Sequence, residues 1–151
     1  MIEIERRFLV DRVPDDLPNP IRIEQAYLTT EPIAVRVRRK DDARILTIKS
    51  GSGLSRTEIE RDLTDDEFDA LWNQPTELRI EKRRHELDLG DGHTAELDLF
   101  DGDLAGHVIV EVEFADEASA SSFTPPDWFG TEVTTDGRYT NAALARHGWP
   151  D

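Results

Sequence analysis

Pairs of like-charged residues, two positions apart, recur along the amino-acid sequence. In a β-strand, side chains at positions i and i+2 point to the same face of the sheet, so each pair places two equal charges on one face. An ordinary barrel or sandwich with its charges in water explains one such strand, but solvated faces usually intersperse the two signs of charge. The six pairs are Glu3 and Glu5, Arg36 and Arg38, Glu58 and Glu60, Lys82 and Arg84, Glu96 and Asp98, and Glu111 and Glu113.

These pairs make chemical sense if their faces converge on one lumen. Carboxylates gathered on one wall repel one another unless a hard cation such as Mg²⁺ or Mn²⁺ lies between them, because both ions take oxygen ligands. Arginine and lysine on another wall suit a ligand with several phosphates, since arginine binds phosphate through two parallel hydrogen bonds and lysine acts as a point charge. Together these groups predict metal-assisted phosphoryl transfer.

Apolar residues alternate with the charged positions, and this period of two predicts strands. Thr64-Asp65-Asp66-Glu67 matches a capping box and opens a helix that Pro75 ends. Shorter helices are expected over Asp116–Ser122 and Thr140–His147, the last with Gly148 as its C-cap. The expected strands are Met1–Val10, Ile21–Thr29, Ile33–Arg39, Arg44–Lys49, Ser55–Leu63, Leu78–Leu89, Thr94–Phe100 and His107–Phe114.

The predicted fold is α+β and mainly antiparallel β, in a single domain over residues 1–151. Eight antiparallel strands can close into a barrel, which removes exposed edges. We expect a closed eight-stranded barrel, or tunnel, with a charged lumen and two or three helices packed outside. The apolar strand faces then point outward, partly covered by the helices.

Composition excludes several function classes. The chain has 151 residues, with 18 Lys and Arg against 33 Asp and Glu, and a net charge of −15. Such a balance argues against a general nucleic-acid surface, which neutralises phosphates with Lys and Arg, but it allows a local basic pocket. There is no cysteine for disulfides or thiolate chemistry. The apolar stretches are too short to cross a membrane, and no signal peptide precedes the first strand, so we expect a cytoplasmic protein.

The N-terminal segment Glu3-Ile4-Glu5-Arg6-Arg7 resembles the E-x-E-x-K signature of the CYTH superfamily, also called triphosphate tunnel metalloenzymes. The resemblance is closest to small bacterial members of the inorganic triphosphatase type and covers nearly the whole chain. Later segments are similar to the family's strands in order and to its C-terminal segment. They are Gln25–Leu28, Val35–Arg38, Leu46–Lys49, Glu58–Glu60, Lys82–Arg84, Glu96–Asp98, Val110–Glu113, Asp127–Gly130, Glu132–Thr134 and Asp136–Asn141.

The resemblance implies an eight-stranded tunnel that binds a triphosphate together with Mg²⁺ or Mn²⁺. It implies that Glu3, Glu5 and Arg7 are catalytic. Arg7 stands where the signature has lysine, so the charge is kept, but arginine cannot release and take up a proton near neutral pH and so cannot serve as a proton carrier. By the same resemblance, the metal ligands are drawn from Glu3, Glu5, Glu58, Glu60, Glu96, Asp98, Glu111 and Glu113. The phosphate-binding residues are Arg36, Arg38, Lys49, Lys82, Arg84 and Arg138.

The leading hypothesis is metal-dependent hydrolysis of a triphosphate, namely inorganic tripolyphosphate, to diphosphate and phosphate. An inorganic substrate is preferred because no base- or thiazole-recognition motif is visible and aromatic residues are few. The alternatives are a class IV-type adenylate cyclase that makes cyclic AMP and diphosphate, a thiamine triphosphatase, a non-catalytic polyphosphate binder, and a plain structural barrel. The expected partner is a small-molecule triphosphate, with no nucleic acid and no membrane, and the protein is expected to be a monomer or homodimer.

Overall fold

The computed structural model describes residues 1–74 and 76–151. Strands dominate this part of the chain, and the hairpin turn at Gly90-Asp91-Gly92 connects two of them. The strands are β1 (Ile2–Val10), β2 (Ile21–Thr29), β3 (Ala34–Lys40), β4 (Ala43–Ser50), β5 (Ser55–Asp62), β6 (Arg79–Gly90), β7 (His93–Phe100), β8 (Val108–Phe114) and β9 (Phe129–Glu132). The helices are α1 (Asp65–Trp72), α2 (Glu117–Ser122) and α3 (Asn141–His147), with short 3-10 turns at Gly102–Leu104 and Gly137–Tyr139.

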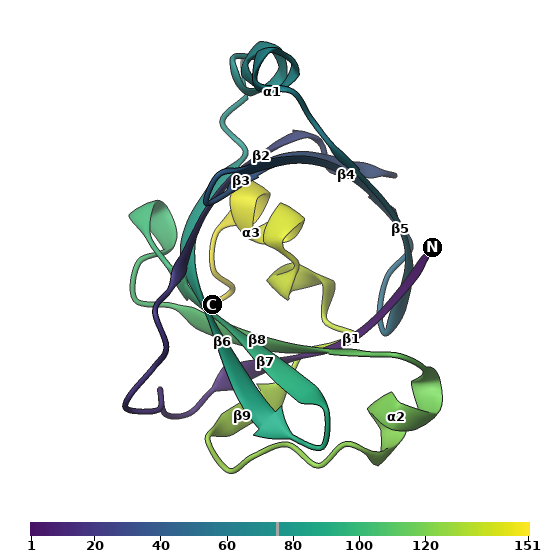
Figure 1. Cartoon of the computed structure of the whole chain (residues 1–151), viewed down its shortest axis with the longest axis vertical. Helices are drawn as coiled ribbons and strands as arrows, with labels where there is room; N and C mark the ends of the chain where they lie inside the picture. Colours follow the sequence, from purple (N-terminus) through teal and green to yellow (C-terminus); the bar gives the residue numbers. More distant parts are fainter. Residues whose placement is uncertain (75) are drawn as a thin grey trace.

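Strands β1 to β8 close into the predicted antiparallel barrel (Figure 1). The hydrogen-bonded order runs β5-β4-β3-β2-β6-β7-β8-β1, and pairing of β1 with β5 closes the ring. In that closing pair Ile2 lies opposite Thr57, and farther along β1 Arg7 lies opposite Glu111 of β8. The register sets the inward faces, because residues two apart on each strand face the same side.

Strand β9 is an element that the alternation of residues did not predict. It pairs with β1 beyond the point where β5 has separated from it, with Val10 opposite Phe129. Leu9 O lies 3.2 Å from where a side chain on Gly130 would begin, so β9 approaches β1 closely at a residue without a Cβ. The barrel seam is therefore shared by β5 at one end and β9 at the other.

Helix α1 covers the outer face of β2, β3 and β4. The predicted capping box is present, since Thr64 Oγ1 accepts a hydrogen bond from the Glu67 amide and the Glu67 carboxylate accepts one from the Thr64 amide. Phe68 is fully buried against Ala26 and Val37. The helix ends at Trp72, while Pro75, which was predicted to end it, lies outside the described residues.

A second apolar cluster covers the outer face of β1, β7 and β8. Phe8, Leu97 and Val110 point outward there and are buried beneath α2 and β9. The rings of Phe8 and Phe129 lie 5.0 Å apart. The prediction that apolar strand faces point outward beneath covering elements is therefore confirmed on this side and beneath α1.

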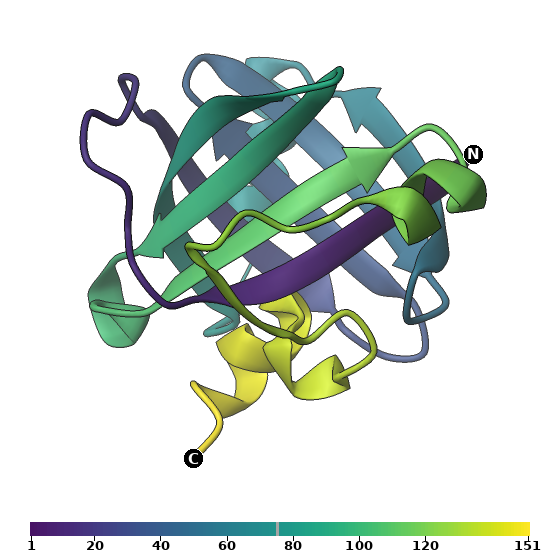
Figure 2. The ribbon, with the colours of Figure 1, turned by 90° about the horizontal axis from the view of Figure 1, so that it is seen from below.

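Helix α3 lies across one end of the barrel (Figures 1 and 2). Leu144 on this helix is buried against Tyr27 and Ile109, which are inward-facing residues at that end. Thr140 caps the helix at its start, and Gly148 ends it with a positive φ of 76°, as the sequence predicted. The lumen is consequently filled with apolar side chains at one end and charged side chains farther in. None of the described helices is long and apolar enough to cross a membrane.

Candidate active site

The charged strand faces enclose a cavity of about 250 Å³. Carboxylate and basic side chains from β1 and β3 to β8 converge on it, and the first turn of α3 closes part of its floor. This volume is below the range of roughly 300–1,000 Å³ for sites that hold drug-sized molecules, so the site suits a compact ligand. The predicted site residues that line the cavity are Glu3, Glu5, Arg7, Arg36, Arg38, Lys49, Glu58, Glu60, Lys82, Arg84, Glu96, Glu111 and Glu113.

Two predicted site residues are not among those that line the cavity. Asp98 is completely buried behind it, where it pairs with Lys82 and Arg84. Arg138 lies on the 3-10 turn before α3, where its side chain is 65% exposed and forms two hydrogen bonds with Asp136. Asp98 thus holds two lumen cations in place, and Arg138 is engaged at the surface.

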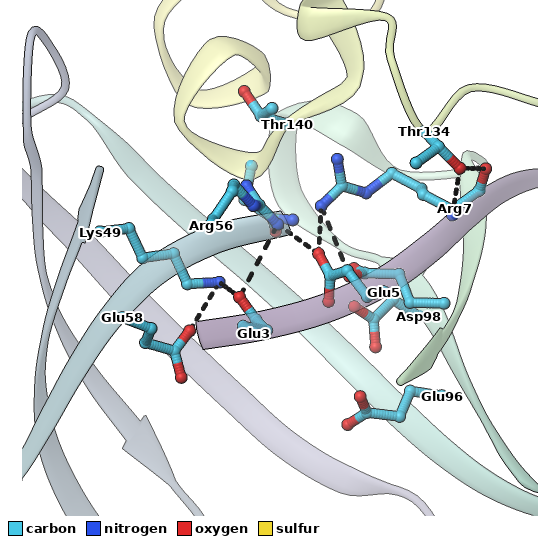
Figure 3. A network of polar contacts seen from close by, with 12 residues as sticks. Glu3, Glu5, Arg7, Lys49, Arg56, Glu58, Glu96, Asp98, Thr134 and Thr140 are labelled. Atoms are coloured by element: carbon cyan, nitrogen blue, oxygen red, sulfur yellow. Dashed lines mark hydrogen bonds and ion pairs between the residues drawn. The ribbon is translucent and has the colours of Figure 1, made fainter. Parts of the chain in front are cut away.

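Lys49 and Arg56 form ion pairs with the carboxylates at the start of β1 (Figure 3). Lys49 Nζ lies 3.0 Å from Glu3 Oε2 and 3.0 Å from Glu58 Oε2. Arg56 Nη2 pairs with Glu5 Oε1 and lies 3.9 Å from Glu3 Oε2. The Glu3 and Glu5 side chains of the N-terminal signature are therefore both compensated by basic residues of β4 and β5.

Arg7 lies between two buried carboxylates. Its Nη2 is 3.1 Å from Glu5 Oε1 and 3.4 Å from Glu111 Oε2. Burial and the neighbouring Glu111 carboxylate raise the pKa of Glu5 well above its usual range. Burial also disfavours charge on Glu111, but Arg7 and a hydrogen bond with Glu5 outweigh it and hold the pKa of Glu111 well below its usual range. Two adjacent carboxylates, Glu5 with a raised pKa and Glu111 with a lowered pKa, thus face the cavity.

A second network fixes the basic pair of β6. Arg84 donates two hydrogen bonds to Asp98, at 2.8 and 2.9 Å, and one to Glu96 at 2.6 Å. Lys82 Nζ lies 2.7 Å from Asp98 Oδ2 and donates to Asn141 Oδ1 at 2.9 Å. Burial lowers the pKa of Lys82 to about 7, although Asp98 opposes the fall. Asn141 thereby connects α3 to a cation of the cavity.

Arg36 and Arg38 differ from the other basic residues of the cavity. Arg38 makes no ion pair with any carboxylate in the described part of the chain, and its Nε donates to Gln25 Oε1 at 2.8 Å. Arg36 donates to Thr47 Oγ1 at 3.1 Å and approaches Glu60 only to 4.0 Å. Burial, together with the charges of Arg36 and Arg84, lowers the pKa of Arg38 to about 9. These two guanidinium groups form a buried positive site in which, among the described residues, the nearest carboxylate contact is the one between Arg36 and Glu60 at 4.0 Å.

Six polar residues of the cavity were absent from the predicted set. They are Tyr27, Lys40, Thr47, Arg56, Thr140 and Asn141. Lys40 shares the face of Arg36 and Arg38, and Arg56 shares the face of Glu58 and Glu60, so the period of two carried the signal for both. Asn141 had no such signal, because its position depends on how α3 packs against the barrel.

The donor set fits a hard divalent cation in its chemistry, because carboxylate oxygens are the ligands that Mg²⁺ and Mn²⁺ prefer. Glu3 Oε2 is buried and accepts no aligned hydrogen bond, although Lys49 lies near it. Within the described ranges, however, no three Asp, Glu or His side chains are grouped closely enough to hold a metal ion. The carboxylates are held by arginine and lysine instead.

A closed antiparallel barrel whose lumen carries carboxylates and basic side chains defines a class of tunnel proteins, and the chain belongs to the CYTH domain family, which matches residues 1–135. It is 45% identical over 147 residues to an inorganic triphosphatase from Nitrosomonas europaea, covering 96% of this chain and 97% of that protein. An inorganic triphosphatase from Acetivibrio thermocellus is 36% identical over 149 residues, covering 96% and 94%. The crystal structure of the inorganic triphosphatase NE1496 matches with a TM-score of 0.70 and 42% identity, covering 94% and 96% of the two chains.

Proposed function

We propose that this protein is a metal-dependent inorganic triphosphatase that hydrolyses tripolyphosphate to diphosphate and phosphate. The observation that carries this proposal is the buried pair of Arg36 and Arg38 in a cavity of about 250 Å³. Arg38 has no carboxylate partner among the described residues, and Arg36 approaches Glu60 only to 4.0 Å. A buried guanidinium without a counter-ion is costly, and a compact polyanion supplies several counter-charges at once. The relatives named inorganic triphosphatase support the same substrate.

The cavity residues divide into two groups by role. Arg36 and Arg38 bind phosphate oxygens, with Lys49, Lys82 and Arg84 as further cations of the wall. Because arginine binds phosphate with two parallel hydrogen bonds, the pair can hold adjacent phosphates without rearranging the barrel. Arg138 belongs to this group only if it leaves Asp136, to which it is hydrogen-bonded at 2.7 Å.

The carboxylates form the second group. We propose that the divalent cation, Mg²⁺ or Mn²⁺, is held by members of the set Glu3, Glu5, Glu58, Glu60, Glu96, Glu111 and Glu113, and that Asp98 acts through Arg84 and Lys82. When bound, the cation supplies Lewis-acid neutralisation of phosphate charge. Glu3 and Glu5 orient the attacking water, whose oxygen forms a bond to the terminal phosphorus while the bridging P–O bond breaks. Diphosphate leaves with the electron pair of that bond, and the proton lost by the attacking water passes to the phosphate products or to solvent.

Arg7 stabilises charge in this scheme and transfers no proton. It is pinned between Glu5 and Glu111, and an arginine keeps its proton near neutral pH. The backbone of Arg7 is fixed as well, because its amide donates to Thr134 Oγ1 at 3.0 Å and its carbonyl accepts from the Val133 amide at 2.8 Å. The guanidinium of Arg7 therefore has a fixed position beside the Glu5 and Glu111 carboxylates.

The experiment compares phosphate release from tripolyphosphate, ATP and thiamine triphosphate, each with Mg²⁺ and with Mn²⁺. We expect tripolyphosphate to be the preferred substrate, and Glu5→Gln to reduce its turnover by roughly a hundredfold or more, as misplacement of the attacking water and the cation does. Faster turnover of ATP or thiamine triphosphate would overturn the substrate assignment. Formation of cyclic AMP would identify a cyclase, and tight binding without turnover a non-catalytic binder. The cytoplasmic location and the monomeric or homodimeric state stay predictions.

A further inference from the structure

Arg56 lies between the two carboxylates of the N-terminal signature (Figure 3). Its Nη2 pairs with Glu5 Oε1 and lies 3.9 Å from Glu3 Oε2. Lys49 contacts Glu3 but not Glu5, and Arg7 contacts Glu5 but not Glu3. Among the cations of the described residues, Arg56 is thus the one that contacts both carboxylates. A divalent cation held by both of them has to take the place of this guanidinium.

Arg56 is held by fewer hydrogen bonds than Arg84. Its side chain is 10% exposed, yet among the described residues its buried Nε has no hydrogen-bond partner and only Nη2 is engaged. Arg84, by contrast, donates from Nε, Nη1 and Nη2 to two carboxylates. A guanidinium carries five N–H donors, so Arg84 is fixed by several charge-assisted bonds, whereas Arg56 can leave by giving up one hydrogen bond to Glu5 and its 3.9 Å contact with Glu3.

We propose that Arg56 is an internal counter-ion that occupies Glu3 and Glu5 in the metal-free protein and is displaced when a divalent cation binds. This inference rests on the proposed role of Glu3 and Glu5 as metal ligands. It explains why the carboxylates remain close together before the cation arrives, because Arg56 neutralises their repulsion. It also assigns to Arg56 a role in setting the affinity for the cation rather than in gripping phosphate.

The first test measures Mn²⁺ binding by isothermal titration calorimetry in phosphate-free buffer, with no substrate present. We expect Arg56→Gln to bind Mn²⁺ about threefold to tenfold more tightly than the wild type, a tenfold change corresponding to about 1.4 kcal/mol. Arg61→Gln is the control on the same strand, because Arg61 is 64% exposed and pairs with Glu67 outside the barrel. This control should leave the affinity unchanged.

A second control separates displacement from a general loss of positive charge in the lumen. Arg38→Gln removes one buried cation that contacts neither Glu3 nor Glu5, so it should tighten Mn²⁺ binding less than Arg56→Gln does. Equal tightening by the two variants, unchanged or weaker Mn²⁺ binding by Arg56→Gln, or no Mn²⁺ binding by any variant would overturn the proposal.

The third measurement is the thermal shift that tripolyphosphate produces in chelator-treated, metal-free protein. Because Arg56 is engaged with carboxylates in that state, Arg56→Gln should retain most of the shift, whereas Arg38→Gln should lose most of it. Loss of the shift in Arg56→Gln would identify Arg56 as a phosphate ligand and overturn the proposal. Failure of the proposed function is distinguishable, since it would appear as absent tripolyphosphate hydrolysis in the wild type while the Mn²⁺ affinities still changed as expected.

Discussion

Replacing Arg38 by methionine should make the protein more stable in the absence of ligand and should abolish its hydrolysis of tripolyphosphate. Arg38 is buried, has no carboxylate partner in the described part of the chain, and has a pKa lowered by burial to about 9, roughly three to four units below its ordinary value. One pKa unit corresponds to about 1.4 kcal/mol, so the charged guanidinium is destabilised by roughly 5 kcal/mol relative to water. At pH 7 the group still carries its proton, and the folded protein therefore bears this cost in full.

Methionine fills a similar volume without charge, but it leaves Gln25 Oε1 without its donor. An unsatisfied buried acceptor costs about 1–3 kcal/mol. The net expectation is a gain of roughly 2 kcal/mol in the free energy of unfolding, or about 4–8 °C in melting temperature for a chain of this size. The additional stability that tripolyphosphate gives to the protein should decrease in Arg38→Met, because Arg38 is one of the two guanidinium groups without a close anion.

The assay is urea denaturation and differential scanning fluorimetry in buffer free of phosphate, sulfate and citrate, each with and without tripolyphosphate and Mn²⁺. Arg38→Met should unfold at higher urea than the wild type in the empty state, gain little from tripolyphosphate, and lose hydrolysis by roughly a hundredfold or more. If Arg38→Met is less stable than the wild type by more than about 1 kcal/mol in the empty state, the reasoning from an uncompensated buried charge is refuted.

Three further predictions concern the scaffold and the cation. Glu132→Gln should lower stability at pH 7 by up to about 1 kcal/mol, because hydrogen bonds from Arg6 and Thr134 lower the pKa of Glu132. This stabilisation is present above the unfolded pKa of about 4.3 and is lost as pH falls through the lower folded value, so the urea curves of variant and wild type should converge as the pH is lowered through that range. Phe68→Ala should cost about 3–5 kcal/mol in urea denaturation, since Phe68 is fully buried beneath α1, while leaving the specific activity of folded protein unchanged; a large loss of kcat would show that α1 acts on the lumen. Removal of divalent cations with a chelator should abolish phosphate release but leave the far-ultraviolet circular dichroism spectrum unchanged, and activity that survives chelation would contradict the metal requirement.

The barrel could be predicted from the sequence because its strands are long and strictly alternating. On β3 the alternation of Val35, Arg36, Val37 and Arg38 fixes both the strand and the face that turns inward. Strand β9 could not be predicted in the same way, since it has four residues and depends on pairing with β1 more than 110 positions earlier. Long-range pairing of so short a segment leaves no local period to detect.

The lumen residues followed from the same alternation, and the exceptions have separate physical causes. Arg56 was missed because the prediction rested on like-charged pairs, whereas Arg56 shares its strand face with Glu58 and Glu60 and carries the opposite charge. The position of the Arg138 side chain depends on the turn that brings Asp136 within hydrogen-bond distance of it. The contact of Asn141 with Lys82 depends on where α3 packs against the barrel. Neither is encoded in the spacing of nearby residues.

The measurement that tests the central claim most directly is a ³¹P nuclear magnetic resonance time course of tripolyphosphate with wild-type protein and Mg²⁺ or Mn²⁺. The account predicts that the tripolyphosphate resonances disappear while diphosphate and phosphate accumulate in equal amounts, and that Arg38→Met and Glu5→Gln leave the substrate almost unchanged. Persistence of tripolyphosphate with the wild type under conditions where ATP or thiamine triphosphate is consumed would contradict it.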